Sequence, residues 1–186
     1  MKRKFNETKA TQAAAKFLQR AGGTLNYMIL IKLLYLLDRK ALLHWGRSVT
    51  FSDCYSMEYG PVVSEVHDLI TEQQRKKGFW QSHIAPPQGY SVSLQENPGD
   101  GALSEAEEDF ITEVFSEYGH YTDPFKLADL LHQELPEWTP VEQGERVKLS
   151  YKDIWIKAGN IDPKQADELQ SELDSLLSDY VALGVS

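Results

Sequence analysis

Side chains that could carry out catalysis or bind a metal are scattered along this sequence. The five histidines are too far apart for a helix to bring any two onto one face one turn apart. A metal site would therefore need distant segments to converge, and solvated or helix-capping histidines are more common. The sequence also lacks a glycine-rich phosphate loop and the HExxH, CxxC and GxSxG motifs. We expect no metal and no cofactor. The histidines are His44, His67, His83, His120 and His132.

Two other groups have suitable chemistry for catalysis when taken alone. Cys54, with a distant histidine, could act as a thiol nucleophile, but a lone cysteine in an extended hydrophobic segment is usually a small core residue. Glu107 and Glu108 could serve as a general acid and base, but their helix pattern places them on the face expected to meet water. The sequence therefore predicts that the chain is not an enzyme.

Length and composition indicate one globular domain, or one domain with an appendage. The chain has 186 residues, of which 41% are hydrophobic and 25% charged. Its single cysteine excludes an intramolecular disulfide and fits a reducing compartment. The basic start is followed by the polar run Asn6–Gln12 rather than by the apolar core of a signal peptide. We expect a cytoplasmic protein without a membrane segment.

Charge is distributed unevenly along the chain. Residues 1–50 carry ten Lys and Arg against two acids, or +8, whereas residues 51–186 carry nine against 26, or −17. The basic N-terminal residues could contact phosphates, but the acidic remainder repels them and no helix-turn-helix stands out. We therefore do not expect nucleic acid to be the main partner. An even spread of solvated charges and a charged partner surface both fit this pattern.

A strongly apolar segment predicts the centre of the fold. Between Tyr27 and Leu37 only Lys32 is charged, so a helix here is apolar on every side and must be buried. The segment is too short to span a bilayer. We expect the helix to be capped by Thr24 and to end at Gly46. An earlier helix, capped by Thr8 or Thr11, should run to Arg20.

The middle of the chain predicts short extended segments and one helix. Loose alternation over 49–59 is typical of a strand, and Gly60 breaks it. Pro61 is suited to the first turn of a helix, so a helix is expected from Val62 to about Arg75. A β-hairpin is expected from residues 80–85 and 90–94 around Pro86-Pro87-Gln88-Gly89.

Helix-start signals are clear in the second half. Ser104 and Glu107 form a capping box that opens a helix ending at Gly119. Further helices are expected from Asp123-Pro124 to His132 or Gln133, and from the Ser150 cap through 151–158. The predicted fold is thus mainly α (α+β): a single globular domain built round a buried central helix, with a small β-hairpin or sheet and a C-terminal amphipathic helix.

The C-terminal helix is expected from Asp162-Pro163 to about Leu183. Its apolar residues repeat at three- and four-residue steps, and its other faces are strongly acidic. We divide the chain into a domain over 1–159 and this acidic helix over 160–186. The helix is expected to pack on its own domain as a lid; the alternative is a ligand for a groove on a partner or a second copy of the chain. The apolar residues are Leu169, Leu173, Leu176, Tyr180 and Leu183.

Several short strings resemble, in order, those of the Panacea (SocA-like) antitoxin domain family. They are Lys32-Leu33-Leu34-Tyr35-Leu36-Leu37-Asp38, Trp45-Gly46-Arg47, Glu58-Tyr59-Gly60-Pro61-Val62-Val63, Leu103-Ser104-Glu105, Tyr118-Gly119, Leu127 to His132, and Glu137-Trp138. Each string alone is weak, but their order is specific, and the resemblance covers roughly residues 10 to 157.

The resemblance implies an antitoxin that neutralises a cognate protein toxin, usually encoded beside it in a bacterial or prophage operon, by direct protein–protein binding. One relative instead delivers its toxin to a protease, so an adaptor role stays open. A second alternative is an enzyme or adaptor whose acidic surface receives some other substrate. A homodimer is also open. An antitoxin needs a stable scaffold and a complementary surface rather than catalytic residues, and an acidic surface would speed its encounter with a basic toxin.

For most matching residues we expect structural roles. Gly46 and Gly60 are positions where the backbone geometry favours glycine, and Pro61 is a helix starter. Tyr35, Asp38, Tyr59, His132 and Trp138 are expected to form a buried polar network that fixes the core. Lys32, the first residue of the first matching string, is also expected to have a structural role. The candidate toxin-binding residues are Glu58, Tyr59, Leu169, Leu173 and Tyr180.

Overall fold

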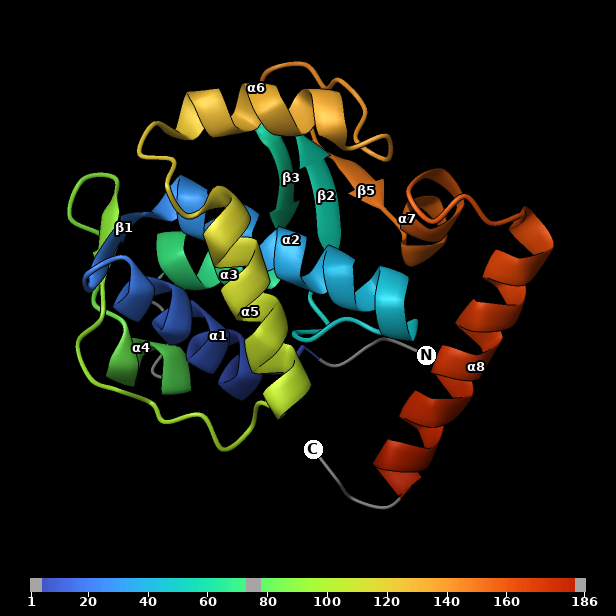
Figure 1. Cartoon of the computed structure of the whole chain (residues 1–186), viewed down its shortest axis with the longest axis horizontal. Helices are drawn as coiled ribbons and strands as arrows, with labels where there is room; N and C mark the ends of the chain where they lie inside the picture. The colour runs from blue at the N-terminus through green and yellow to red at the C-terminus, as the bar shows by residue number, and fades with distance from the viewer. Residues whose placement is uncertain (1–4, 73–77, 183–186) are drawn as a thin grey trace.

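A buried helix forms the centre of the computed structural model, which describes residues 5–72 and 78–182. Helix α2 (Tyr27–Trp45) runs through the middle of the molecule (Figure 1), and every residue from Ile29 to Asp38 is buried. Its C-cap, Gly46, has a left-handed backbone with φ +72°, as predicted. The N-cap is Asn26 rather than Thr24, because the helix begins at Tyr27 and the Asn26 side chain accepts from the Met28 amide. Thr24 lies two residues earlier, at the start of strand β1 (Thr24–Asn26).

Two helices cover one side of α2. Helix α1 (Glu7–Arg20) and helix α5 (Glu105–Tyr118) both pack against it. In α5 the predicted Ser104–Glu107 capping box is confirmed. The predicted cap of α1 is wrong: Asn6 accepts the hydrogen bond from the Lys9 amide, and the helix begins at Glu7.

The prediction that Glu107 faces water is wrong. Its carboxylate is fully buried and accepts hydrogen bonds of 2.6 and 2.8 Å from Lys9 Nζ of α1. The Arg47 guanidinium lies 3.8 Å away. Glu107 thus both caps α5 and forms an ion pair between α5 and α1. The sequence did not reveal this pair because Lys9 is 98 positions away.

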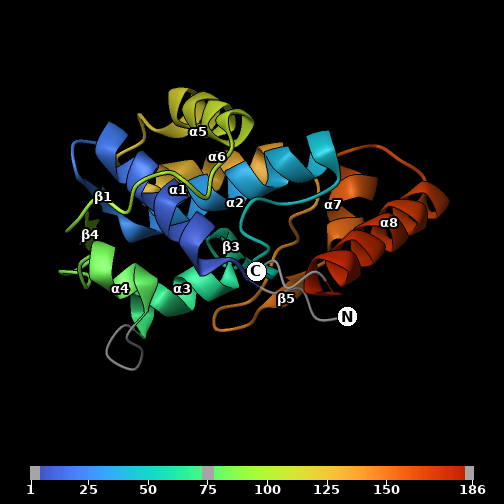
Figure 2. The same ribbon diagram turned by 90° about the horizontal axis from the view of Figure 1, so that it is seen from below.

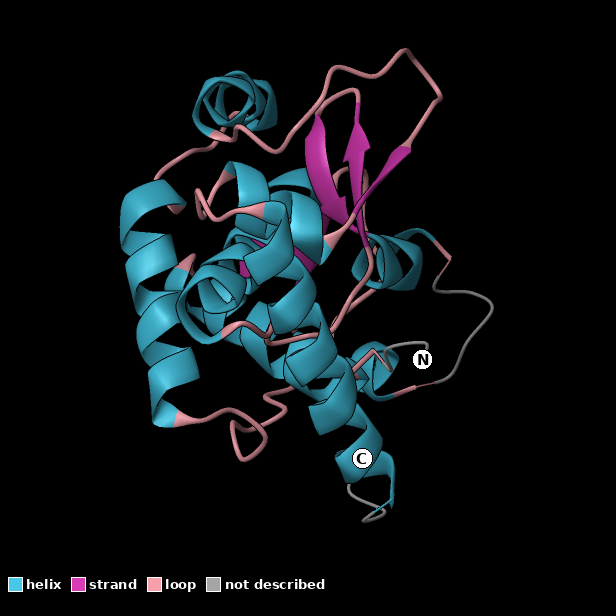
Figure 3. Cartoon of the chain, turned by 90° about the vertical axis from the view of Figure 1, so that its right-hand side faces the viewer, coloured by secondary structure: helices cyan, strands magenta, loops and turns pink. Residues whose placement is uncertain are grey.

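The main sheet consists of three antiparallel strands in the order β3-β2-β5. They are β2 (Cys54–Met57), β3 (Gly60–Val63) and β5 (Val147–Leu149), which lie side by side in Figure 3. Cys54 is buried in β2, in agreement with the predicted core role. Met57 pairs with Gly60, so Glu58 and Tyr59 form the tip of the β2–β3 turn.

Pro61 does not start a helix, contrary to the prediction. It lies in edge strand β3 opposite Ser56, and helix α3 (Ser64–Thr71) begins three residues later. A proline is tolerated on an edge strand because its missing N–H leaves fewer hydrogen bonds unmade there than in a central strand. Residues 73–75, where the predicted helix ended, lie outside the described part of the chain.

The predicted hairpin over 80–94 is replaced by a helix and a strand. Helix α4 (Phe79–His83) buries Trp80 against α1, and the Trp80 amide donates to Glu7 Oε1 at 3.0 Å. Strand β4 (Ser91–Ser93) pairs instead with β1. The isolated bridges Ile84–Leu94 and Gln88–Ser91 are hairpin-like, and the Ala85 amide donates to the Ser93 carbonyl at 2.9 Å. Figure 2 shows α3 and α4 below α1 and α2, with α5 above them.

The last three helices cover the remaining faces. Helix α6 (Pro124–Glu134) lies across the ends of β3 and β2 (Figure 1), and α7 (Tyr151–Lys157) starts at the predicted Ser150 cap. Helix α8 (Pro163–Ala182) packs on α7 (Figure 2). Its Ala166 and Leu173 are buried, so this helix does pack on its own domain. The Tyr180 side chain and Leu183 lie outside the described residues.

The molecule is therefore a mainly α, α+β single domain, with one continuous core around α2. Across the described residues, no helix is both long and apolar enough to cross a membrane.

Candidate protein-interaction cleft

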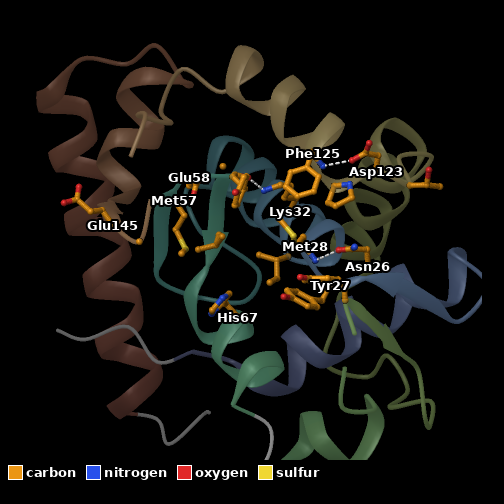
Figure 4. Close-up of a pocket in the computed structure, with 18 residues that line it drawn as sticks. Asn26, Tyr27, Met28, Lys32, Met57, Glu58, His67, Asp123, Phe125 and Glu145 are labelled. Carbon is orange, nitrogen blue, oxygen red and sulfur yellow. Dashed lines mark hydrogen bonds between the residues drawn. The ribbon is translucent and has the colours of Figure 1, made fainter. Parts of the chain in front are cut away.

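A cleft of about 800 Å³ opens between α2, the β2–β3 turn and the start of α6 (Figure 4). The first two turns of α2 form one wall, and the tip of the β2–β3 turn forms another. Tyr59, Phe125 and Tyr90 at its rim are 42%, 52% and 67% exposed. Such exposed aromatic rings around a concave surface are typical of a binding site.

The rim aromatics are arranged in pairs. Tyr59 and Phe125 meet edge to face with ring centroids 5.3 Å apart, and Tyr27 and Tyr90 lie 6.0 Å apart. Acidic side chains that line the same cleft are Glu58, Asp123 and Glu145. Aromatic rings are enriched in protein–protein interfaces, and the rims of such interfaces are polar.

Lys32 lies at the floor of the cleft and is 2% exposed. Its Nζ donates a hydrogen bond to the main-chain carbonyl of Tyr59, which Figure 4 marks with a dashed line. Within residues 5–72 and 78–182, no carboxylate forms an ion pair with this ammonium. Burial lowers the pKa of Lys32 to about 8, because a charged amine is poorly solvated there.

Gly60 fits this site for two reasons. Its φ of +99° is a conformation that residues with a side chain rarely adopt. A Cβ atom at this position would also lie 3.1 Å from Lys32 Nζ and 3.6 Å from His132 Nε2. The sequence prediction of a backbone-geometry role for Gly60 agrees with this φ.

His132 and Trp138 complete the cluster below the turn. Their rings stack with centroids 3.8 Å apart, and Trp138 Nε1 donates to the Met57 carbonyl at 3.2 Å. His132 Nε2 is buried and has no hydrogen-bond partner among the described residues. Burial, and then the positive charge of Lys32, lower the pKa of His132. Lys32, Gly60, His132 and Trp138 therefore converge at one place.

A second cluster lies deeper along α2. Tyr35 Oη donates to Glu137 Oε1 at 2.8 Å, and Arg39 Nε donates to the same oxygen at 2.5 Å. Glu137 is fully buried, and burial and this nearby negative charge raise the pKa of Tyr35 well above its ordinary value. Sequence reasoning did not single out Glu137; its position directly before Trp138 in a matching string was the only signal.

The single buried network predicted from sequence is in fact divided. Asp38 belongs to neither cluster: its Oδ1 accepts from the Val49 and Thr50 amides at 2.9 Å, and its Oδ2 accepts from the Thr50 hydroxyl. Tyr59 is exposed at the rim rather than buried. Asp38 therefore fixes the loop after α2, and the network prediction is correct only in parts.

The candidate toxin-binding residues also separate. Glu58 and Tyr59 lie on the cleft, whereas Leu169 and Leu173 of α8 do not line it and pack into the core. Leu169 covers Gly46, with its Cδ2 3.7 Å from a Cβ placed there. In the described part of the chain, no three His, Cys, Asp or Glu side chains are grouped to hold a metal ion.

The family model of the antitoxin SocA-like, Panacea domain matches residues 30–139. This range covers more than half of the chain, so the chain belongs to this antitoxin-like family. The match is narrower than the predicted 10 to 157, but it contains Lys32, Gly60, His132 and Trp138. No curated protein and no solved structure gave a significant match.

Proposed function

We propose that this protein is an antitoxin that neutralises a cognate protein toxin, encoded nearby, by direct binding through the cleft. The observation that carries the proposal is the position of the family-matched residues. Lys32, Gly60, His132 and Trp138 lie together beneath a turn that presents the exposed ring of Tyr59. A conformation fixed in this way presents a preformed contact surface, which lowers the entropic cost of binding.

Charge supports a basic partner. Residues 51–186 carry a formal charge of −17, and these residues supply all the acids of the cleft. Complementary charge accelerates the encounter of two proteins and selects among partners. We propose that neutralisation needs no catalytic step by this chain, and that residues 1–159 form the binding domain with 160–186 as an accessory helix.

The test is co-expression of the chain with the product of the neighbouring reading frame, read as bacterial growth. The wild-type chain should restore growth. The double variant Tyr59→Ala/Phe125→Ala should not, because it removes both exposed rings while leaving the core intact. The matched control is Val147→Ala, which removes another exposed apolar side chain, from β5. A neighbouring product that is harmless alone would contradict the proposal, and equal rescue by the double variant would contradict the use of the cleft.

A second measurement separates blocking from delivery. Purified chain and toxin should form a complex in which the toxin is inactive without any protease. Rescue that disappears in protease-deficient cells, together with full toxin activity in the purified mixture, would instead indicate an adaptor.

A further inference from the structure

Two buried polar atoms near the floor of the cleft lack the partners that such atoms usually have: Lys32 lines the cleft, and His132 lies behind Gly60 rather than among the lining residues. Lys32 Nζ has three donors, and the Tyr59 carbonyl is its acceptor among the described residues. His132 Nε2 has no partner there. Both atoms lie within 3.6 Å of one point, the position of a Cβ on Gly60. Buried charges are normally paired, so this arrangement points to a group supplied from outside the chain.

The group that best satisfies the buried Lys32 ammonium is a carboxylate. An ammonium pairs most strongly with an anionic oxygen. The Lys32 side chain is surrounded by the apolar part of the cleft, with the Phe125 ring beside it (Figure 4). Such surroundings weaken screening and strengthen a single charge–charge contact.

The chain's own carboxylates do not serve this purpose. Asp123 Oδ1 accepts from the backbone amides of Phe125 and Lys126 and caps α6. Glu145 lies at the far end of the cleft from Lys32 in Figure 4. Glu58, on the turn itself, forms no ion pair with Lys32 in the described part of the structure. These acids at the rim disfavour a uniformly acidic ligand, so they favour one carboxylate flanked by uncharged or basic residues.

We propose that Lys32 is a specificity-determining residue that receives an acidic side chain of the partner protein. An Asp or Glu carboxylate of the partner enters the cleft and pairs with Lys32 Nζ. An apolar residue next to it packs on the Tyr59–Phe125 pair. The identity of the occupant as a protein segment depends on the proposed function, whereas the carboxylate subsite itself does not.

The experiment uses the full chain with ¹³C-labelled lysine side chains, observed by NMR. The probes are N-acetylphenylalanine, which carries an aromatic ring and a carboxylate, and N-acetylphenylalaninamide, which is matched but neutral. The Lys32 signal, assigned by its loss in Lys32→Met, should shift saturably with the acid and at least tenfold less with the amide. Lys126→Met, which removes an exposed lysine of α6 beside the cleft, is the matched control and should leave the response to the acid unchanged.

Equal responses to the two probes, or no movement of the Lys32 signal with the acid, would overturn the subsite. If Lys32→Met does not fold, the charge-conserving variant Lys32→Arg provides the same assignment of the Lys32 signal, and the comparison of the two probes is made on the wild-type chain. Where Lys32→Met folds, it should weaken the complex with the toxin at least tenfold, and Lys126→Met should not. If the acid binds at Lys32 but the chain fails to neutralise its neighbour's product, the subsite stands and the proposed function falls. If neutralisation is intact while neither probe moves Lys32, only the subsite falls.

Discussion

Lys32 Nζ in the central helix donates to the carbonyl of Tyr59, 27 positions later in the chain. This bond joins the buried central helix to an exposed turn of the cleft. The turn is therefore held by the central helix as well as by the pairing of its own strands. A change at the floor of the cleft should consequently alter the conformation of the rim.

Gly60→Val should lower the free energy of unfolding by about 2 kcal/mol or more, because a β-branched residue is strained at φ +99° and its Cβ meets Lys32 and His132. Gly144→Val is the matched control, since Gly144 has φ +84° but no atom within 4 Å of a Cβ. Urea unfolding of both variants separates crowding from backbone strain. Equal losses of unfolding free energy in the two variants would show that the contact with Lys32 and His132 is unimportant. An unchanged unfolding free energy in Gly60→Val would contradict the structural role of Gly60.

Glu137→Gln should lower the free energy of unfolding by about 2 kcal/mol. The reason is that the Glu137 carboxylate, which accepts hydrogen bonds from Arg39 and Tyr35, is fully buried. Glu113→Gln removes a 2.7 Å ion pair with Lys40 at the surface and should cost about 0.5 kcal/mol or less. Thermal and urea unfolding measure both. Similar values for the two variants would mean that the Glu137 cluster does not stabilise the core.

Asp38 should make stability depend on pH in the direction opposite to that of most carboxylates. Burial raises its pKa from 3.8 to about 6, against the opposing effect of its hydrogen bonds with Thr50 and Val49. Between about pH 4 and 6 the folded chain retains a proton that the unfolded chain has released, so stability falls as the pH rises. The change is at most about 3 kcal/mol.

The comparison with Asp38→Asn isolates this effect, because asparagine does not titrate in this range. Relative to this variant, the wild-type chain should be more stable at pH 4 than at pH 7 in urea unfolding. A difference that stays constant with pH, or changes in the other direction, refutes the assignment.

Leu173→Ala should cost about 2 kcal/mol, because Leu173 of α8 is 5% exposed and truncation leaves a cavity. Leu176→Ala, on the same helix but 39% exposed, should change stability by about 0.5 kcal/mol or less. The two melting curves decide whether α8 packs as described. Equal effects would indicate that the helix is detached in solution.

A chain that ends at Gly159 should remain folded but melt at a lower temperature and neutralise the toxin less well. Removal of α8 uncovers α7 and Gly46 but leaves the cleft complete. Circular dichroism and the co-expression assay measure the two effects. Loss of the cooperative melt would make α8 part of the core, and full rescue would show that it is dispensable for neutralisation.

Local signals predicted the parts of this fold that depend on neighbouring residues. The Ser104–Glu107 box, the Ser150 cap and the Gly46 stop were all correct, because each acts within one turn of its own helix. Pro61 was misassigned because the same residue suits both a first helical turn and an edge strand. Only the pairing of β3 with β2 decides between them.

The parts that sequence could not supply depend on distant partners. Thr24 pairs with Ser93, and Lys9 neutralises Glu107, so neither position shows its role locally. At the cleft, the sequence indicated Lys32, Gly60 and His132 separately. Their convergence at one point follows from the packing of α2, β3 and α6, which periodicity does not describe.

The order of the main sheet has a consequence for how the protein is made. Strand β2 lies between β3, which follows it immediately, and β5, whose Leu149 pairs with Cys54. A nascent chain can therefore form one side of the sheet early, but the other side must wait until residues 147–149 leave the ribosome. Until then an edge of β2 is open, and such intermediates are prone to aggregation and proteolysis. Since Gly144 and Glu145 also line the cleft, binding competence should appear only after these residues have left the ribosome.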